Sequence, residues 1–270
     1  MIRNLGIKIK PCKKNIGAEL ICNLNNITKN QIKLIKESLN KYGVIFFRNQ
    51  NLKPVNYIEF AKKFGQIADY PMLKGLSNKF SQITVVERKM SDKGPSFGEQ
   101  FHTDSSYTKK PPRLTMLLAK IVPKKGLGNT EFASQYLAYE NLSKFYKKKI
   151  KNLKAVFSSS GPISVTRLER EKEKGTGKSR SFKTTHKIVR KINKRKAIYC
   201  SPGHVEKFLN VDKQEDSKMK NFLFKHQVKK NFIFEFEWEK NSLAIWDNRS
   251  MLHQATSFNG SRKMYRITIK

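Results

Sequence analysis

Short runs of apolar and β-branched residues, separated by turn residues, recur along the chain and constrain its fold more than any other feature. Residues 44–47 (VIFF) and 114–122 are apolar runs with the length of buried strands. Further strands are predicted at residues 7–9, 83–86, 130–133, 197–200, 232–236, 243–246 and 264–269. The pattern predicts a mainly β protein with flanking helices (α+β), whose strands build a β-sandwich core.

Helices are expected among these strands. Thr28, followed three residues later by Gln31, forms a capping-box pattern, and the apolar stripe behind it predicts a helix that stops at Gly43. Pro54 is expected to open a second helix, which stops at Gly65. Two more helices are predicted at about residues 136–147 and 216–229. Because they are scattered among many strands, the helices are expected to decorate the β core.

The composition is that of a globular protein. The chain has 270 residues, of which 38% are hydrophobic and 11% aromatic. We expect a single domain over residues 1–270. Residues 167–185 are charged, rich in Gly and Ser, and weakly periodic. Long segments of this kind within compact domains are usually functional or disordered, so we expect a mobile insertion or lid there.

Neither a secretory signal nor a membrane span is expected. The N-terminal sequence has no long apolar run before a small-residue cleavage site, and no 18 consecutive residues are apolar. The cysteines, Cys12, Cys22 and Cys200, form no CxxC pair. This usage fits a reducing cytoplasm and argues against a disulfide framework or a structural zinc site.

The formal charge of +35 has two interpretations. One is an anionic partner such as nucleic acid. The other is a general bias toward Lys, Asn and Ile, which spreads lysines along the chain with modest clusters such as residues 147–151. Because no basic and aromatic module of the RNA-binding type stands out, we favour the bias and expect no nucleic-acid partner. A positive field could still attract small anions.

The strongest chemical signal is the pair His102-x-Asp104. In an extended segment residues i and i+2 face the same side, so an imidazole and a carboxylate could bind one metal ion from adjacent corners. A second imidazole must come from elsewhere, and His253 follows the sequence WDNRSML. Two His and one carboxylate form the facial triad of non-haem Fe(II) oxygenases, which leaves three coordination positions open. The pair alone is a weak signal, since this spacing also arises by chance.

The order of the surrounding motifs strengthens the interpretation. Thr130 follows a glycine-rich loop, and Arg262 and Arg266 lie on the last predicted strand. The segments FHTDSSY, VPKKGLGNTEF and WDNRSMLHQA followed by RKMYR resemble the taurine dioxygenase/2,4-dichlorophenoxyacetate dioxygenase (TauD/TfdA) family of 2-oxoglutarate-dependent oxygenases. The resemblance covers nearly the whole chain. It implies a double-stranded β-helix (jelly-roll) core with the metal at its open end, and a cytoplasmic enzyme that forms dimers or tetramers.

The resemblance also implies a role for each motif. The metal ligands it implies are His102, Asp104 and His253. Thr130 and Arg262 match the pair that anchors the distal carboxylate of 2-oxoglutarate, and Arg266 matches the residue that meets the anionic group of the substrate. A planar guanidinium suits a carboxylate well. Because Arg266 lies four residues after Arg262, the two should share one face of a strand.

The function implied is an Fe(II)-, 2-oxoglutarate- and O2-dependent dioxygenase. It would hydroxylate a small organic anion, such as an aryloxyacetate-like carboxylate or a sulfonate, and decarboxylate 2-oxoglutarate to succinate and CO2. Asp104 favours hydroxylation, because related halogenases lack this carboxylate and bind chloride there. Two alternatives stay open: a basic nucleic-acid-binding protein, and a jelly-roll metal-binding protein without oxygenase activity.

Several other polar residues receive structural interpretations. His186, His204 and His226 lack a carboxylate at metal spacing, so each is expected to be solvated or hydrogen-bonded, with a structural role near the site possible for His186. Trp246 and Asp247 are expected to support the segment that carries His253.

Overall fold

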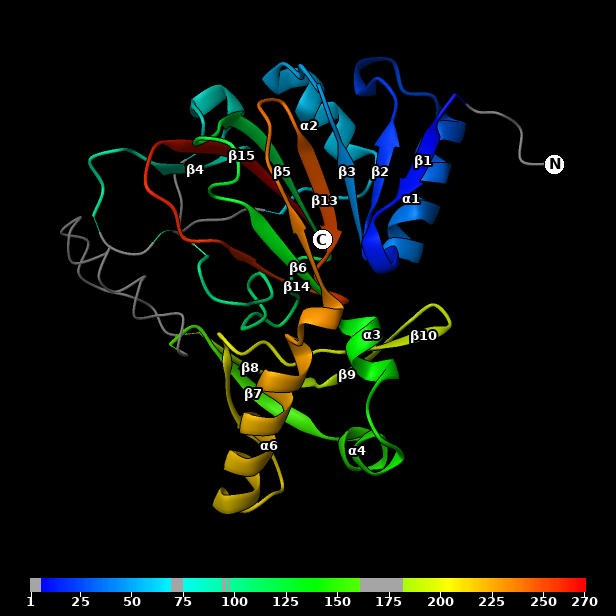
Figure 1. Ribbon diagram of the computed structural model, residues 1–270, viewed down its shortest axis with the longest axis vertical. Coiled ribbons are helices and arrows are strands. Elements are labelled where there is room, and N and C mark those ends of the chain that lie inside the picture. The colour runs from blue at the N-terminus through cyan, green and yellow to red at the C-terminus, as the bar shows by residue number, and fades with distance from the viewer. Residues whose placement is uncertain (1–5, 69–74, 94–95, 97, 161–181) are drawn as a thin grey trace.

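A seven-stranded sheet is the largest element of the fold (Figure 1). The computed structural model describes residues 6–68, 75–93, 96, 98–160 and 182–270. The strands run in the order β1-β2-β3-β13-β5-β15-β4, and every neighbouring pair is antiparallel except β2 and β3. They are β1 (Lys8–Pro11), β2 (Ala18–Ile21), β3 (Val44–Phe47), β4 (Thr84–Arg88), β5 (Leu114–Ile121), β13 (Leu243–Asp247) and β15 (Arg262–Ile269).

A smaller sheet faces the large one. Its order is β12-β6-β14, with β6 (Thr130–Ser134) between β12 (Ile233–Phe236) and β14 (Met251–Ala255). Buried side chains from both sheets share one apolar cluster, which includes Phe132 of the small sheet and Trp246 of the large one. The fold is therefore mainly β with flanking helices, and its two sheets form the jelly-roll core that the resemblance implied.

Two helices cover the outer face of the large sheet. α1 (Lys29–Tyr42) packs on β2, β3 and β13, and α2 (Pro54–Lys62) packs on β15. The capping box before α1 is confirmed: the Gln31 backbone N–H donates to the Thr28 hydroxyl, and the Gln31 side chain accepts from the Thr28 backbone N–H. Apolar residues of both helices and of the sheet's outer face form the largest core cluster.

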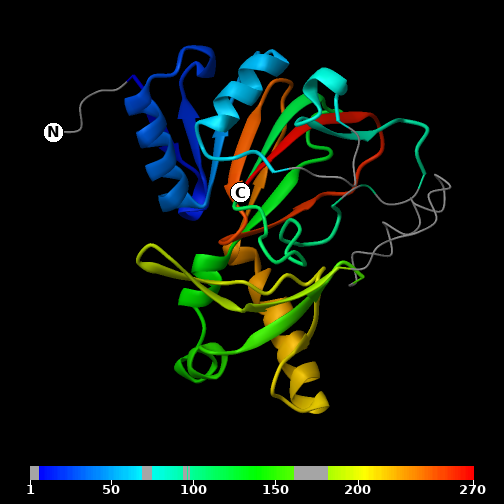
Figure 2. The ribbon, with the colours of Figure 1, turned by 180° about the vertical axis from the view of Figure 1, so that it is seen from behind.

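A second region lies beside the small sheet, at the lower end of both ribbon views (Figures 1 and 2). It contains a three-stranded sheet in the order β11-β7-β8, a β9–β10 hairpin and three helices, which share an apolar cluster. These elements are α3 (Gln135–Glu140), α4 (Lys144–Ile150), β7 (Lys154–Ser158), β8 (Lys183–Lys187), β9 (Val189–Ile192), β10 (Arg195–Ile198), β11 (Val205–Phe208) and α6 (Lys213–Gln227).

The helix predicted at residues 136–147 is wrong as one element, because the chain forms α3 and α4 there. The Asn141 side chain donates to the carbonyl of Leu137 and ends α3, and the Ser143 hydroxyl accepts from Tyr146 and caps α4. The helix predicted at 216–229 begins earlier, since the Asp212 carboxylate caps α6.

The predicted insertion at residues 167–185 lies largely outside the described residues. Only its last residues are described, and Lys183 begins β8, which pairs with β7. Among the helices that the structure describes, none has the length and apolar character that crossing a bilayer requires.

Candidate metal centre

A backbone bridge brings the two predicted imidazole ligands together. The N–H of His102 donates to the carbonyl of His253 at 3.0 Å, and the N–H of His253 donates to the carbonyl of His102 at 3.0 Å. The segment that carries His102 thereby continues the small sheet beyond β14. Residues opposite each other in such a pair project to the same face. Two side chains separated by most of the chain therefore meet because of strand register.

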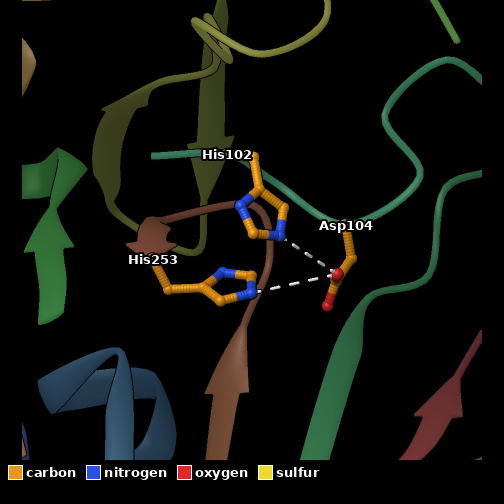
Figure 3. A group of neighbouring side chains, drawn as sticks. All are labelled: His102, Asp104 and His253. Carbon is orange, nitrogen blue, oxygen red and sulfur yellow. Dashed lines mark ion pairs between the residues drawn. The ribbon is translucent and has the colours of Figure 1, made fainter. Parts of the chain in front are cut away.

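Asp104 completes the group that the sequence predicted. Its Oδ1 lies 3.8 Å from Nε2 of His102 and 3.9 Å from Nε2 of His253 (Figure 3). Each of the three residues is buried, and among the described residues they are the one cluster of His, Cys, Asp and Glu whose ligand atoms could hold a metal. Ligands on adjacent corners of an octahedron lie about 3 Å apart, so a closure of about 1 Å would seat an ion.

The surroundings orient both imidazoles. Nδ1 of His102 lies 2.7 Å from the carbonyl of Gln100, to which it donates, so Nε2 carries the lone pair that faces Asp104. The ring of His253 packs against Trp246, with centroids 4.6 Å apart, and against Phe132. The predicted support of the His253 segment by Trp246 is therefore seen directly.

Charge and burial set the protonation of the group. Burial lowers the pKa of His253 to about 3, and it also lowers the pKa of His102. Burial alone would raise the pKa of Asp104, but the neighbouring Arg266 and then the two imidazoles hold that pKa well below its usual range. At neutral pH the group is therefore one carboxylate and two neutral imidazoles, which are the forms that bind metal.

The two predicted arginines lie on one face of β15, as their spacing indicated. Arg266 is buried, and its guanidinium lies 2.9 Å from Oδ1 of Asp104. Arg262 is also buried, four residues away on the same strand, with a nitrogen 3.4 Å from the hydroxyl of Thr130. Of the residues that the sequence singled out, Arg266 thus lies beside the candidate metal ligands, and Arg262 lies with Thr130 on the same side of β15.

Arg262 sits in an aromatic pocket that sequence reasoning missed. Its guanidinium lies 5.8 Å from the ring centre of Trp238 and 5.9 Å from that of Phe258, and the Trp238 indole donates to the Thr130 hydroxyl at 2.9 Å. Burial lowers the pKa of Arg262 to about 10, and no carboxylate among the described residues counteracts that shift. A buried cation of this kind is stabilised by an anion. The surroundings of Arg262 therefore suit an anionic group such as a carboxylate.

The other histidines have hydrogen-bonding roles in the structure. Nε2 of His226 lies 2.8 Å from the carbonyl of Ala138, and Nε2 of His186 lies 3.0 Å from that of Thr108. His204 is hydrogen-bonded as well, through Nδ1 to the hydroxyl of Ser106, and its ring centre lies 6.4 Å from that of His102.

Comparison with known proteins points to one family. The model of the family described as "Taurine catabolism dioxygenase TauD, TfdA family" matches residues 8–268. An alpha-ketoglutarate-dependent sulfonate dioxygenase of Saccharomyces cerevisiae is 27% identical over 93% of this chain and 63% of its own length. An alkylsulfatase of Acinetobacter baylyi is 27% identical over 97% of this chain and 84% of its own length.

The solved structures agree with the sequence matches. A taurine dioxygenase from Burkholderia xenovorans superimposes with a TM-score of 0.81 at 25% identity, covering 97% of this chain and 89% of that one. The chain spans slightly less than two thirds of the length of the sulfonate dioxygenases of two yeasts, at 65% and 63%.

Proposed function

This chain belongs to the TauD, TfdA family, and we propose that it is an Fe(II)- and 2-oxoglutarate-dependent dioxygenase that hydroxylates a small organic anion. One observation carries the proposal: two imidazoles and a carboxylate form a buried group that could hold a metal, with the buried Arg266 beside it and the buried Arg262 four residues away on the same strand. Fe(II), 2-oxoglutarate and O2 together supply the oxidising power for hydroxylation of a C–H bond, while 2-oxoglutarate is converted to succinate and CO2.

The chain's own residues have distinct tasks in this proposal. The iron ligands are His102, Asp104 and His253. Arg262 and Thr130 bind the distal carboxylate of 2-oxoglutarate, where the guanidinium supplies charge and the hydroxyl one more polar contact. Burial of this pair excludes water, which strengthens both contacts. The protein thus contributes ligand geometry, anion positioning and exclusion of solvent.

We assign the anionic group of the prime substrate to Arg266. The guanidinium is buried beside Asp104, so a substrate anion bound there would place a neighbouring carbon near the metal. Relatives are named for sulfonates, alkyl sulfates and 2,4-dichlorophenoxyacetate, which share an anionic group and differ in the carbon skeleton. The proposed substrate class is therefore a small organic anion of one of these kinds.

The test is formation of succinate from 2-oxoglutarate under air with Fe(II). The panel contains sulfonates, sulfate esters, aryloxyacetates and simple carboxylates. We expect at least one class to stimulate succinate formation in the wild type and none to do so in His102→Ala. His226→Gln is the matched control, because His226 is a buried imidazole whose bond to Ala138 lies away from the centre. Equal turnover by wild type and His102→Ala would refute the proposal.

Four further properties are proposed with this function. The chain acts as a single domain, it is a dimer or tetramer, it has no nucleic-acid partner, and it works in the cytoplasm. One cooperative thermal transition and a multimeric mass by light scattering would support the first two. Tight binding to DNA or RNA that weakens steeply with salt would contradict the absence of a nucleic-acid partner. It would favour the alternative of a basic nucleic-acid-binding protein, which the charge of +35 suggests.

A further inference from the structure

The two carboxylate oxygens of Asp104 have different surroundings. Oδ1 faces the imidazoles of His102 and His253, at 3.8 and 3.9 Å. Oδ2 accepts a hydrogen bond of 2.6 Å from the hydroxyl of Thr115, a fully buried residue of β5. One oxygen is therefore directed at the candidate metal position, and the other is held by the protein.

The Thr115 hydroxyl is the last link of a buried hydrogen-bond chain. The indole N–H of Trp246 donates to Oδ1 of Asn248 at 3.0 Å, and Nδ2 of Asn248 donates to the Thr115 hydroxyl at 2.8 Å. Trp246, Asn248 and Thr115 are at most 2% exposed. Water therefore does not compete for these bonds, and each polarises the next.

The groups at the two ends of this hydrogen-bond series determine which atom donates in each bond. An indole nitrogen only donates, so the atom of Asn248 that faces Trp246 is the carbonyl oxygen and the amide nitrogen faces Thr115. A hydroxyl carries a single proton, and Thr115 already accepts from Asn248. That proton therefore goes to Asp104, whose carboxylate only accepts.

We propose that Thr115 is a positioning residue that restricts Asp104 to coordination through one oxygen. Carboxylates bind metals through either one oxygen or both. The hydrogen bond to Oδ2 favours the one-oxygen mode and so preserves the three open positions of a facial triad, two for the chelating cosubstrate and one for O2. The inference rests on the proposed function through the assignment of Asp104 as an iron ligand.

A purely structural role for Thr115 would lead to a different experimental result. If its hydroxyl only satisfied a buried carboxylate, its loss would lower the stability of the fold and leave the coordination of the metal unchanged. The number of positions open to water on a bound ion therefore separates the two roles.

The experiment counts the waters bound to Mn(II) in the loaded protein, from the broadening of the Mn(II) electron paramagnetic resonance signal in 17O-enriched water. We expect about three waters in the wild type and in Thr115→Ser, which keeps the hydroxyl. Thr115→Val keeps the shape without the hydroxyl, and about two waters are expected as both oxygens of Asp104 bind. An unchanged count in Thr115→Val overturns the inference.

Thr268→Val is the matched control. Thr268 lies directly opposite Thr115 on β15, and of these two hydroxyls only that of Thr115 is bonded to Asp104. The wild-type count is expected in this variant. A count that falls equally in Thr268→Val and Thr115→Val would also overturn the inference, because the change would then not depend on the bond to Asp104.

A second variant tests the same bond if Thr115→Val does not fold. Asn248→Asp keeps the shape of the side chain but offers Thr115 an acceptor, so the hydroxyl proton is shared between two carboxylates. A water count below that of the wild type supports the inference, and an unchanged count overturns it. Wild-type protein that takes up no Mn(II) would instead refute the proposed function itself.

Discussion

The guanidinium of Arg266 and the imidazoles of His102 and His253 all face the same oxygen of Asp104. A divalent cation between the imidazoles would repel the guanidinium and compete with it for that oxygen. Binding of iron is therefore expected to release Arg266 toward an external anion. Arg262 has no such competitor, because it lies beside Thr130 and two aromatic rings.

Truncation of the two arginines should therefore affect different steps, namely binding of 2-oxoglutarate and stimulation by substrate. Arg262→Ala is expected to weaken 2-oxoglutarate binding by about 10- to 100-fold, since a charge-assisted hydrogen bond is worth about 1.5–3 kcal/mol. Arg266→Ala is expected to keep the affinity for 2-oxoglutarate and to lose the stimulation of succinate formation by substrate. Titration with 2-oxoglutarate and succinate assays with and without substrate measure both effects. Equal loss of 2-oxoglutarate affinity in both variants would contradict the assignment.

The buried imidazoles predict how stability depends on pH. Burial lowers the pKa of His253 to about 3 and also lowers that of His102, whereas an unfolded chain takes up protons at a pKa of about 6.5. Their contribution to the stability of the metal-free protein is therefore complete above that pH and decreases as the pH falls below it, by about 1.4 kcal/mol per pH unit for His253.

This dependence is measured by the thermal midpoint of metal-free protein at pH 7.5, 6.5, 5.5 and 5.0. We expect little change between the first two values and a steady fall below them. The fall should be smaller in His253→Gln, which removes one of the histidines whose pKa burial lowers. An identical pH profile in wild type and His253→Gln would show that His253 does not contribute to this dependence.

Among single residues, the candidate metal ligands and the two arginines could be predicted from the sequence. His102 and Asp104 were visible through their spacing, and the arginines through their place on the last strand. Thr115, Trp238 and Phe258 were not, because nothing local separates a polar residue in an apolar strand, or an aromatic one, from ordinary packing. Their roles depend on which strands lie opposite, as the bond between Thr115 and Asp104 shows.

At the scale of elements, the predictable strands were those with continuous apolar runs, such as β3 and β5, which are buried on both faces. The strand β14 (MLHQA) was missed as an element, although its His253 was singled out. Its polar residues and short length give a weak pattern, and its pairing with β6 is a tertiary contact. For the same reason the bridge between His102 and His253 could not be predicted.

Gly43, which ends α1, packs closely against the strand that carries His253. Gly43 has a φ of +77°, and a Cβ there would lie 2.7 Å from the sulfur of Met251 in β14. Gly43→Ala is therefore expected to lower the free energy of unfolding through both backbone strain and a clash, by about 2–4 kcal/mol. Chemical denaturation measures the loss.

Gly126→Ala separates those two contributions. Gly126 has a similar φ of +80°, but the nearest atom to its added Cβ would be 4.0 Å away. This control should therefore show the strain alone, about 1–2 kcal/mol. Equal losses in the two variants would mean that the close approach to Met251 contributes nothing.

At the scale of the whole molecule, two facing sheets bury the centre between them while helices cover the outer face of the large sheet (Figures 1 and 2). A buried centre whose ligands come from separate strands should stabilise the fold when it is filled, since binding to the native state alone adds about 2.7 kcal/mol at one hundred times Kd. Mn(II) with 2-oxoglutarate is expected to raise the Tm by roughly 5–10 °C.

The ligand-induced rise in Tm should be lost in His102→Ala and kept in His226→Gln, the matched buried histidine. A rise of the same size in His102→Ala would show that the ions stabilise the basic chain elsewhere. A rise with Mn(II) alone that 2-oxoglutarate does not increase would contradict the assignment of Arg262 and Thr130.

Anaerobic equilibrium dialysis of wild type and His253→Ala against Fe(II) and labelled 2-oxoglutarate tests directly whether the two imidazoles and Asp104 hold iron. We expect one iron and one 2-oxoglutarate per wild-type chain, with 2-oxoglutarate retained only when iron is present, and neither retained by His253→Ala. Full retention of iron by His253→Ala, or none by the wild type, would contradict this assignment.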